Sequence, residues 1–346
     1  MTFINTIQTI LRKSNGNILN FYVRDKVLFY REFIFKQGWQ SPKEFIEDVE
    51  HNQLDIKIDS NDKVYGIVHV KSGEVIYLYT KNNIMYKEKL FEYDTGKYTI
   101  KYPYIQKNDS DIHVLYYLQD VTDNKTWGII NHYYNGASWT QNDIAIIKSY
   151  PILNPFVVSS KDKNISLFYL DKMNDGEEIF TMSFDTSFGT WSKPQQITAT
   201  NNKKLYLNAL NKDLTSHYIT WSEFIDNNLV VRHMKYSYKD DILDTSEIKL
   251  LSQPSNCSFP TMLLTGDTLW NVWVKMNKLV SCYSFNHGET WSSPKVNITS
   301  TKVDFIRYKF SSNSKDDLTN FKVNSVFGSY YPKISFIGFE NFQTRT

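Results

Sequence analysis

Short runs of hydrophobic residues recur along the whole chain, and polar segments of a few residues separate them. Between residues 152 and 198, four runs follow one another: Ile152–Ser159, Ile165–Asp171, Ile179–Phe184 and Lys193–Thr198. Runs of this length that are rich in β-branched and aromatic residues and bounded by turn residues are typical of strands. Apart from the N-terminus, no stretch places its apolar residues at helical spacing, so the pattern predicts an all-β protein.

The N-terminus is the exception, because its apolar residues lie at helical spacing. They are Phe3, Ile4, Ile7, Ile10 and Leu11, and Arg12 and Lys13 follow them. This spacing predicts an amphipathic helix within residues 1–16 that docks on the domain, with binding to a membrane surface as the alternative. A secretory signal would place its positive charges before an unbroken apolar core, so we expect none here. No other stretch reaches transmembrane length.

Four tryptophans mark a repeat of about fifty residues. Trp39, Trp139, Trp191 and Trp291 are 100, 52 and 100 residues apart, which indicates that two copies lack the tryptophan. A glycine stands shortly before each one: Gly38, Gly136, Gly189 and Gly288. Glycine at this place predicts a tight turn whose backbone conformation a side chain would disfavour.

A second series of runs has the same period. Six strand-like runs each end on an aromatic residue or histidine: Asn17–Tyr22, Val64–His69, Asp111–Tyr116, Asn164–Tyr169, Ser216–Trp221 and Thr268–Trp273. Their ends are 47, 47, 53, 52 and 52 residues apart. Repeats of this length with four strands each are typical of a β-propeller, in which every sheet is one blade. We therefore predict one six-bladed propeller domain over residues 17–346.

The ends of the chain are predicted to meet in one blade. The first repeat begins at its second strand, and the run Val303–Phe310 is expected to supply the missing inner strand and so to close the ring. Two further runs, Phe321–Phe327 and Ile334–Phe339, leave open either a seventh partial blade or an external flap.

Charge and composition exclude several classes of protein. The chain has 39 Lys and Arg against 37 Asp and Glu, so it lacks the concentrated basic face that nucleic acid requires. We expect the 2 cysteines, Cys257 and Cys282, to be reduced structural thiols. The cytoplasm is therefore the default location, although an extracellular one stays open. Neither a zinc spacing nor a calcium loop is recognisable, and we predict no metal and no cofactor.

One turn carries a recognisable motif. The segment Ser284-Phe-Asn286-His-Gly288-Glu-Thr-Trp291 resembles the Asp-box, or bacterial neuraminidase repeat, of the sialidase superfamily, with Asn286 at the Asp position. A second copy contains Ser183, Asp185, Gly189 and Trp191. The resemblance implies a propeller fold, and it implies that these residues are structural and lie on the face away from the ligand site.

The catalytic residues that the resemblance would imply are largely missing. A sialidase needs three arginines for the substrate carboxylate, the first in a Phe-Arg-Ile-Pro motif, and the nearest sequence here surrounds Arg307. Arg24 is a second candidate ligand-binding residue, whereas Arg31 and Arg232 are expected on solvated faces of sheets. Lysine cannot replace the bidentate geometry of arginine, so this deficit counts against hydrolysis of sialic acid.

The loops at the other end of the strands are the predicted ligand face. Asp171 and Glu223 follow the landmark runs of adjacent repeats, and paired carboxylates are what glycoside hydrolysis requires. Alternatively, both cap loop amides or pair with Lys275 and Arg24. Tyr169, Trp221 and Trp273 would offer flat apolar faces to a sugar, or they pack between blades. We predict a non-catalytic module that binds a glycan or a glycan-bearing surface. A glycoside hydrolase and a scaffold for a protein partner are the alternatives.

Overall fold

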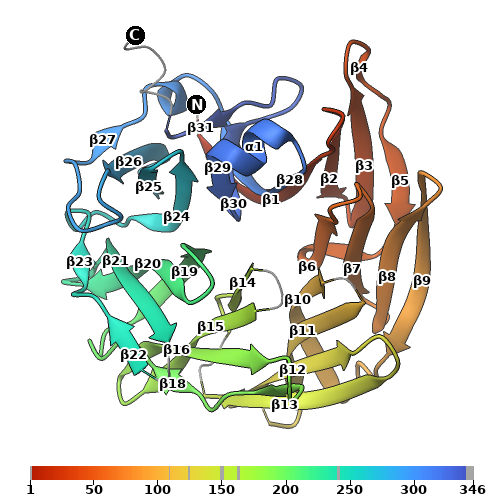
Figure 1. Ribbon diagram of the computed structural model, residues 1–346, viewed down its shortest axis with the longest axis horizontal. Helices are drawn as coiled ribbons and strands as arrows, with labels where there is room; N and C mark the ends of the chain where they lie inside the picture. Colours follow the sequence, from red (N-terminus) through yellow and green to blue (C-terminus); the bar gives the residue numbers. More distant parts are fainter. Residues whose placement is uncertain are drawn as a thin grey trace. The chain divides into compact units, whose positions relative to one another are not determined.

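Strands make up nearly all of the regular structure, as the short hydrophobic runs predict. The computed structural model describes residues 2–108, 110–123, 125–148, 152–161, 164–239 and 242–339. Within these residues the strands form six sheets (Figure 1). Antiparallel pairing of consecutive strands in sheets of four or more is the architecture of propeller blades. The prediction of a six-bladed β-propeller is confirmed.

The contacts divide the chain into two compact units. The first combines residues 7–152 with 309–318, and the second combines residues 2–6, 153–308 and 319–339. Each unit has its own core clusters of buried residues. No helix within the described residues is long and apolar enough to cross a membrane.

Two complete blades lie in the first unit, and each has four strands. One contains β6 (Val49–Ile58), β7 (Val64–Val70), β8 (Glu74–Lys81) and β9 (Ile84–Glu92). The other contains β10 (Tyr98–Asn108), β11 (Asp111–Asp120), β12 (Trp127–Tyr134) and β13 (Trp139–Ile147). Buried residues of β7, β10 and β11 form one apolar cluster, so these two blades pack face to face.

Three blades lie in the second unit. The first contains β14 (Val157–Lys161), β15 (Asn164–Met173), β16 (Gly176–Asp185), β17 (Thr190–Trp191) and β18 (Gln195–Gln196). The next contains β19 (Lys204–Asn211), β20 (Ser216–Ile225), β21 (Asn228–Lys239), β22 (Ile242–Thr245) and β23 (Lys249–Leu250). The last contains β24 (Ser258–Thr265), β25 (Thr268–Lys275), β26 (Lys278–Ser284), β27 (Lys295–Val296) and β29 (Phe321–Val323), with the 3-10 helix η1 (Thr299–Thr301) after β27.

The remaining sheet contains strands from both ends of the chain (Figure 1). These strands are β1 (Phe3–Arg12), β2 (Ile18–Arg24), β3 (Val27–Ile34), β4 (Gly38–Trp39), β5 (Lys43–Ile46), β28 (Phe305–Ser312), β30 (Ser325–Ser329) and β31 (Phe336–Ile337). The short helix α1 (Lys315–Asn320) follows β28. The strand order is β31-β30-β28-β1-β2-β3-β4, with β5 also paired to β3.

The predicted N-terminal helix is wrong, because residues 3–12 form strand β1. This strand pairs with β2 on one edge and with β28 on the other, and Gln8, Thr9, Ile10 and Leu11 are all buried. A strand that is covered on both faces needs no alternation, so its apolar residues can coincide with helical spacing. The β-branched isoleucines and threonines of this segment also favour a strand over a helix.

The prediction for the C-terminal run is confirmed in part. Strand β28 does join the sheet of the N-terminal strands, but it pairs with β1 rather than with β2. The reason is that β1 already occupies the inner position that the sequence left unfilled. The later strands extend existing sheets, since β29 pairs with β24, and β30 pairs with β28 and β31. Within the described residues they form no seventh blade.

The predicted glycine turns adopt the expected backbone. Gly38, Gly136, Gly189 and Gly288 all have positive φ, at 85°, 90°, 67° and 86°. Such values lie in the left-handed region that favours glycine. Each turn connects the third strand of its blade to the fourth.

Hydrogen bonds within the turn after β26 explain its motif. Ser284 Oγ accepts from the backbone N–H of Gly288 at 2.8 Å, and Asn286 Oδ1 accepts from that of Thr290 at 2.9 Å. The Trp291 indole donates to the carbonyl oxygen of Gly288 at 3.1 Å. These side chains therefore satisfy the backbone of the turn itself.

The turn after β16 is built in a similar way. Asp185 Oδ1 accepts from the backbone N–H of Ser187 at 2.8 Å, and the Gly189 N–H donates to the Asp185 carbonyl oxygen at 2.8 Å. Ser183 donates its backbone N–H to Ser192 Oγ, and Trp191 packs against Phe184 with ring centroids 5.4 Å apart.

Candidate functional site

A row of tyrosines crosses the outer strands of the blade formed by β6–β9. Tyr65 on β7 lies opposite Tyr79 on β8, which in turn lies opposite Tyr86 on β9. Directly opposed residues of antiparallel strands point to the same face of the sheet. Tyr77, two residues before Tyr79, shares that face and lies opposite Glu88. The local register alone therefore gathers four tyrosines on one face.

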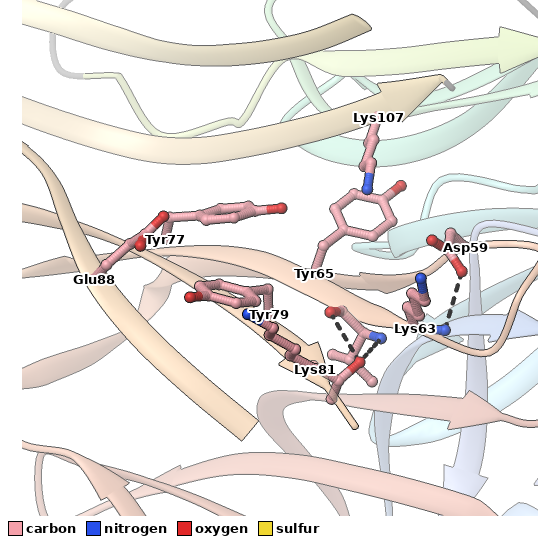
Figure 2. Close-up of a pocket in the computed structure, with 10 residues that line it drawn as sticks. Asp59, Lys63, Tyr65, Tyr77, Tyr79, Lys81, Glu88 and Lys107 are labelled. Atoms are coloured by element: carbon pink, nitrogen blue, oxygen red, sulfur yellow. Dashed lines mark hydrogen bonds between the residues drawn. The ribbon is translucent and has the colours of Figure 1, made fainter. Parts of the chain in front are cut away.

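A cavity of about 320 Å³ opens over this face (Figure 2). Strands β7 and β8 supply most of its wall, while the β6–β7 turn, β9 and the neighbouring β10 supply the rest. The lining residues are Asp59, Lys63, Val64, Tyr65, Tyr77, Tyr79, Thr80, Lys81, Glu88 and Lys107. We call this cavity the tyrosine pocket.

The rings of Tyr77 and Tyr79 form a stacked apolar surface along one side of the pocket, and Tyr86 continues the stack outside the lining residues. The ring centroids of Tyr77 and Tyr79 are 5.5 Å apart with 21° between the planes, and those of Tyr79 and Tyr86 are 5.7 Å apart at 20°. Tyr77 and Tyr79 are half-buried, and Tyr86 is exposed. The rings are therefore packed well enough to hold their orientation and still reach solvent.

The phenol groups of Tyr65 and Tyr77 are held in the protonated form. Burial raises the pKa of Tyr65, whose hydroxyl also makes a hydrogen bond with the backbone of Lys107. Burial, together with the nearby Glu88, raises the pKa of Tyr77 as well. These two hydroxyls remain neutral donors and acceptors at physiological pH.

Charged groups surround the aromatic surface. Lys63, Lys81 and Lys107 line the pocket together with Asp59 and Glu88, so both ammonium donors and carboxylate acceptors are present. Asp59 also accepts from the backbone N–H of Lys63 at 3.0 Å, which orders the turn that forms one edge (Figure 2). No group of three or more acidic, histidine or cysteine side chains in the described part of the chain is arranged to hold a metal ion.

The three aromatic residues predicted to bind a ligand lie in the core instead. Tyr169, Trp221 and Trp273 are 2%, 0% and 1% exposed. Trp221 packs between the blades of β15 and β20, and Trp273 packs beside the buried free thiols of Cys257 and Cys282. These rings present no face to a sugar, and their burial supports the packing role that the sequence left open. The recurrence of an aromatic residue at one strand position reflects how each blade is built.

The two predicted carboxylates lie on neighbouring blades in different environments. Glu223 is completely buried on β20, where Trp221 Nε1 donates to it at 2.8 Å and Asn202 Nδ2 at 2.9 Å. Asp171 is half-buried near the end of β15 and accepts from the backbone N–H of Lys172 at 2.8 Å. Glu223 is therefore held within the core of its blade, and of the two carboxylates only Asp171 is accessible to solvent.

The arginines are also placed differently from expectation. Arg31 is buried rather than solvated, because its guanidinium donates twice to Asn20 Oδ1, at 2.9 and 2.7 Å. Arg232 is mostly buried, 3.8 Å from Glu223 Oε1. Arg24 is exposed and lies 3.9 Å from Asp25.

Arg307 is held by its own protein environment. Its guanidinium carbon lies 4.0 Å from the centroid of the Phe259 ring, and Nη2 donates to Asn5 Oδ1 at 3.0 Å. Burial lowers the pKa of Arg307 to about 10. Arg307 and Arg24 belong to different units of the chain.

The sequence analysis missed the tyrosine pocket. The sequence feature that indicates it is the segment Tyr77-Leu-Tyr79, in which the tyrosines are two residues apart, followed by Tyr86. These residues do not recur in the other repeats, so the period of about fifty residues does not mark them.

Comparison with known proteins supports the fold. No family model matches the sequence, and no curated protein matches it. Among solved structures, an α-L-arabinofuranosidase mutant from Fusarium graminearum in complex with an iminosugar inhibitor has a TM-score of 0.52 at 11% identity, covering 94% of this chain and 98% of that one. The WD40 domain of SCAP from fission yeast has a TM-score of 0.53 at 9% identity, covering 96% and 82%.

A lectin from Aleuria aurantia, in complex with α-methyl-L-fucoside, is more distant. Its TM-score is 0.48 at 10% identity, with 84% of this chain and 91% of that one covered. At identities this low, likeness to solved structures concerns the fold alone. The class of protein is therefore a β-propeller, and its function must be argued from its own residues.

Proposed function

We propose that this propeller is a carbohydrate-binding module and that the tyrosine pocket holds the sugar. The observation that carries the proposal is the stacked pair of Tyr77 and Tyr79, which lines one cavity together with charged side chains. Sugar rings have an apolar face of C–H groups and an edge of hydroxyls. A flat aromatic surface with polar groups around it matches both.

The polar groups are of the kinds that sugar hydroxyls need. Lys63, Lys81 and Lys107 donate hydrogen bonds, and Asp59 and Glu88 accept them. The cavity of about 320 Å³ is at the small end of ligand pockets, which suits one or two sugar units. The proposal concerns binding, and it names no reaction.

The likeness to the Fusarium arabinofuranosidase is compatible with this proposal but adds only the fold. That protein is named as an enzyme that acts on a sugar, and it shares 11% identity with this chain. A propeller can carry unrelated functions, so the residues of the pocket are what support sugar binding.

A glycan array followed by calorimetry on the bound glycan would test the proposal. We expect selective binding, weakened about 3- to 10-fold in Tyr79→Ala, because one aromatic contact contributes ~0.5–1.5 kcal/mol. Tyr98→Ala is the matched control, since Tyr98 is 37% exposed, lies on β10 of the same unit and does not line the pocket. An array without selective binding, or equal affinities for Tyr79→Ala and the wild type, would refute the proposal.

A further inference from the structure

One buried carboxylate is shared by two lysines in the first unit. Asp55 on β6 is 2% exposed. Lys309 on β28 approaches its Oδ1 at 2.8 Å, and Lys57 on β6 approaches its Oδ2 at 3.5 Å. Asp55 Oδ2 also accepts from the backbone N–H of Ile105 at 3.2 Å. The two ammonium groups therefore lie on different oxygens of the same side chain.

The other contacts of the two lysines are neutral. Lys57 donates to Gln106 Oε1 at 3.0 Å and lies 3.6 Å from the centroid of the Tyr104 ring. Lys309 donates to the carbonyl oxygen of Leu54 at 3.3 Å. Two positive charges and one negative charge leave this cluster with a net charge of +1.

The net charge of +1 is unfavourable because the two lysines are partly removed from water. The side chains of Lys57 and Lys309 are only 18% and 38% exposed. Burial lowers the pKa of Lys57 to about 8; the nearby Lys309 also lowers it, and Asp55 opposes both effects. A second negative charge at this place would remove the imbalance.

Lys309 can also donate a hydrogen bond to such a negative group. An ammonium group has three donors, and two of those of Lys309 go to Asp55 and Leu54. Its exposed fraction is the larger of the two lysines, so it has access to solvent.

We infer that Lys57 and Lys309 form a binding site for an anionic oxygen group, a carboxylate or a sulfate. The bound oxygens would accept from the Lys309 ammonium group on the side away from Asp55, as charge-assisted hydrogen bonds, and Lys57, which contacts Asp55, Gln106 and the Tyr104 ring, would add its positive charge. The anion can come from an acidic sugar, from a sulfated one or from a free ion. This site is distinct from the tyrosine pocket, because neither lysine lines that cavity.

Amine labelling of the intact protein tests this site without a variant. Acetylation rates of Lys57, Lys309 and the exposed Lys71 would be measured by mass spectrometry in sulfate, glucuronate, chloride and glucose at constant ionic strength. We expect sulfate or glucuronate to slow labelling of Lys57 and Lys309 at least threefold, with Lys71 unchanged. The more effective of the two anions shows whether the site prefers a sulfate or a carboxylate group. Equal rates in all four solutions would overturn the inference.

A variant adds a second, independent result. In Lys309→Met the protection of Lys57 should be lost, whereas in Lys71→Met it should persist; protection that survives in a folded Lys309→Met protein would also overturn the inference. Should Lys309→Met fail to fold, the labelling of the wild type still decides. Protection that persists in Tyr79→Ala separates this site from the sugar site, so either proposal can fail alone.

Discussion

Trp221 donates its indole N–H to Glu223 Oε2 at 2.8 Å, and both side chains are completely buried on β20. The residues are two apart on one strand, so their side chains share a face. This hydrogen bond explains why two residues with the chemistry of a sugar site serve the packing between blades. The carboxylate satisfies a buried donor, and the ring fills the core.

Removing that carboxylate should destabilise the protein. We expect Glu223→Ala to lower the free energy of unfolding by ~2–4 kcal/mol, because the donors of Trp221 and Asn202 lose their buried acceptor. Urea unfolding measures the change. Glu50→Ala, at an exposed position of the other unit, is the control and should cost less than about 0.5 kcal/mol. Equal effects of the two substitutions would show that the buried network contributes nothing.

Neighbouring rings of the tyrosine pocket should act together in binding. Tyr77→Ala and Tyr79→Ala are each expected to weaken sugar binding about 3- to 10-fold. The double variant should lose less than the product of the two effects, because the rings stack on each other and each orients its neighbour. Calorimetry with the glycan identified on the array gives the three affinities. Strict additivity would mean that the rings bind independently.

Buried histidines should make the protein sensitive to acid. Burial lowers the pKa of His69, His113 and His217 to about 4, and that of His233 to about 3. Between about pH 6.5 and 4 the unfolded chain binds these protons and the folded chain does not, so stability falls as the pH falls. Each histidine lowers the free energy of unfolding by up to ~1.4 kcal/mol for every pH unit of acidification in that range.

One substitution isolates a single histidine of this set. His217 packs against Phe168 with ring centroids 5.1 Å apart, so His217→Phe keeps an aromatic ring in the same core. Urea unfolding at pH 7, 6 and 5 should show a shallower loss of stability in the variant, by about one proton. An identical slope in both proteins would place the acid sensitivity elsewhere.

A comparison of two glycine turns distinguishes the destabilisation caused by backbone strain from that caused by steric crowding. Gly288 and Gly38 have φ of 86° and 85°, but a methyl group at Gly288 would lie 2.6 Å from His233 Nε2, whereas nothing lies within 4 Å at Gly38. We expect Gly38→Ala to cost ~1–2 kcal/mol and Gly288→Ala to cost clearly more. Thermal unfolding of both variants provides the comparison, and equal melting temperatures would contradict it.

The fold could be predicted further than the site. Short hydrophobic runs and the period of about fifty residues predicted six four-stranded blades. Such a prediction is possible because neighbouring residues largely determine where a strand or a turn forms. The strand β1 was missed because its apolar residues Phe3, Ile4, Ile7, Ile10 and Leu11 lie on both of its faces, and residues 8–11 are all buried. Helical and buried-strand patterns cannot be separated over so short a segment.

By itself the sequence determined the repeat, the turns and which side chains share a face of a strand. Only the tertiary structure decided which elements lie beside that face. The tyrosine pocket needs Lys107 from the next blade, and Asp55 meets Lys309 across 254 residues of sequence. Local periodicity encodes the direction of a side chain, whereas its partner depends on how distant strands pack, and that is set by the burial of the whole core.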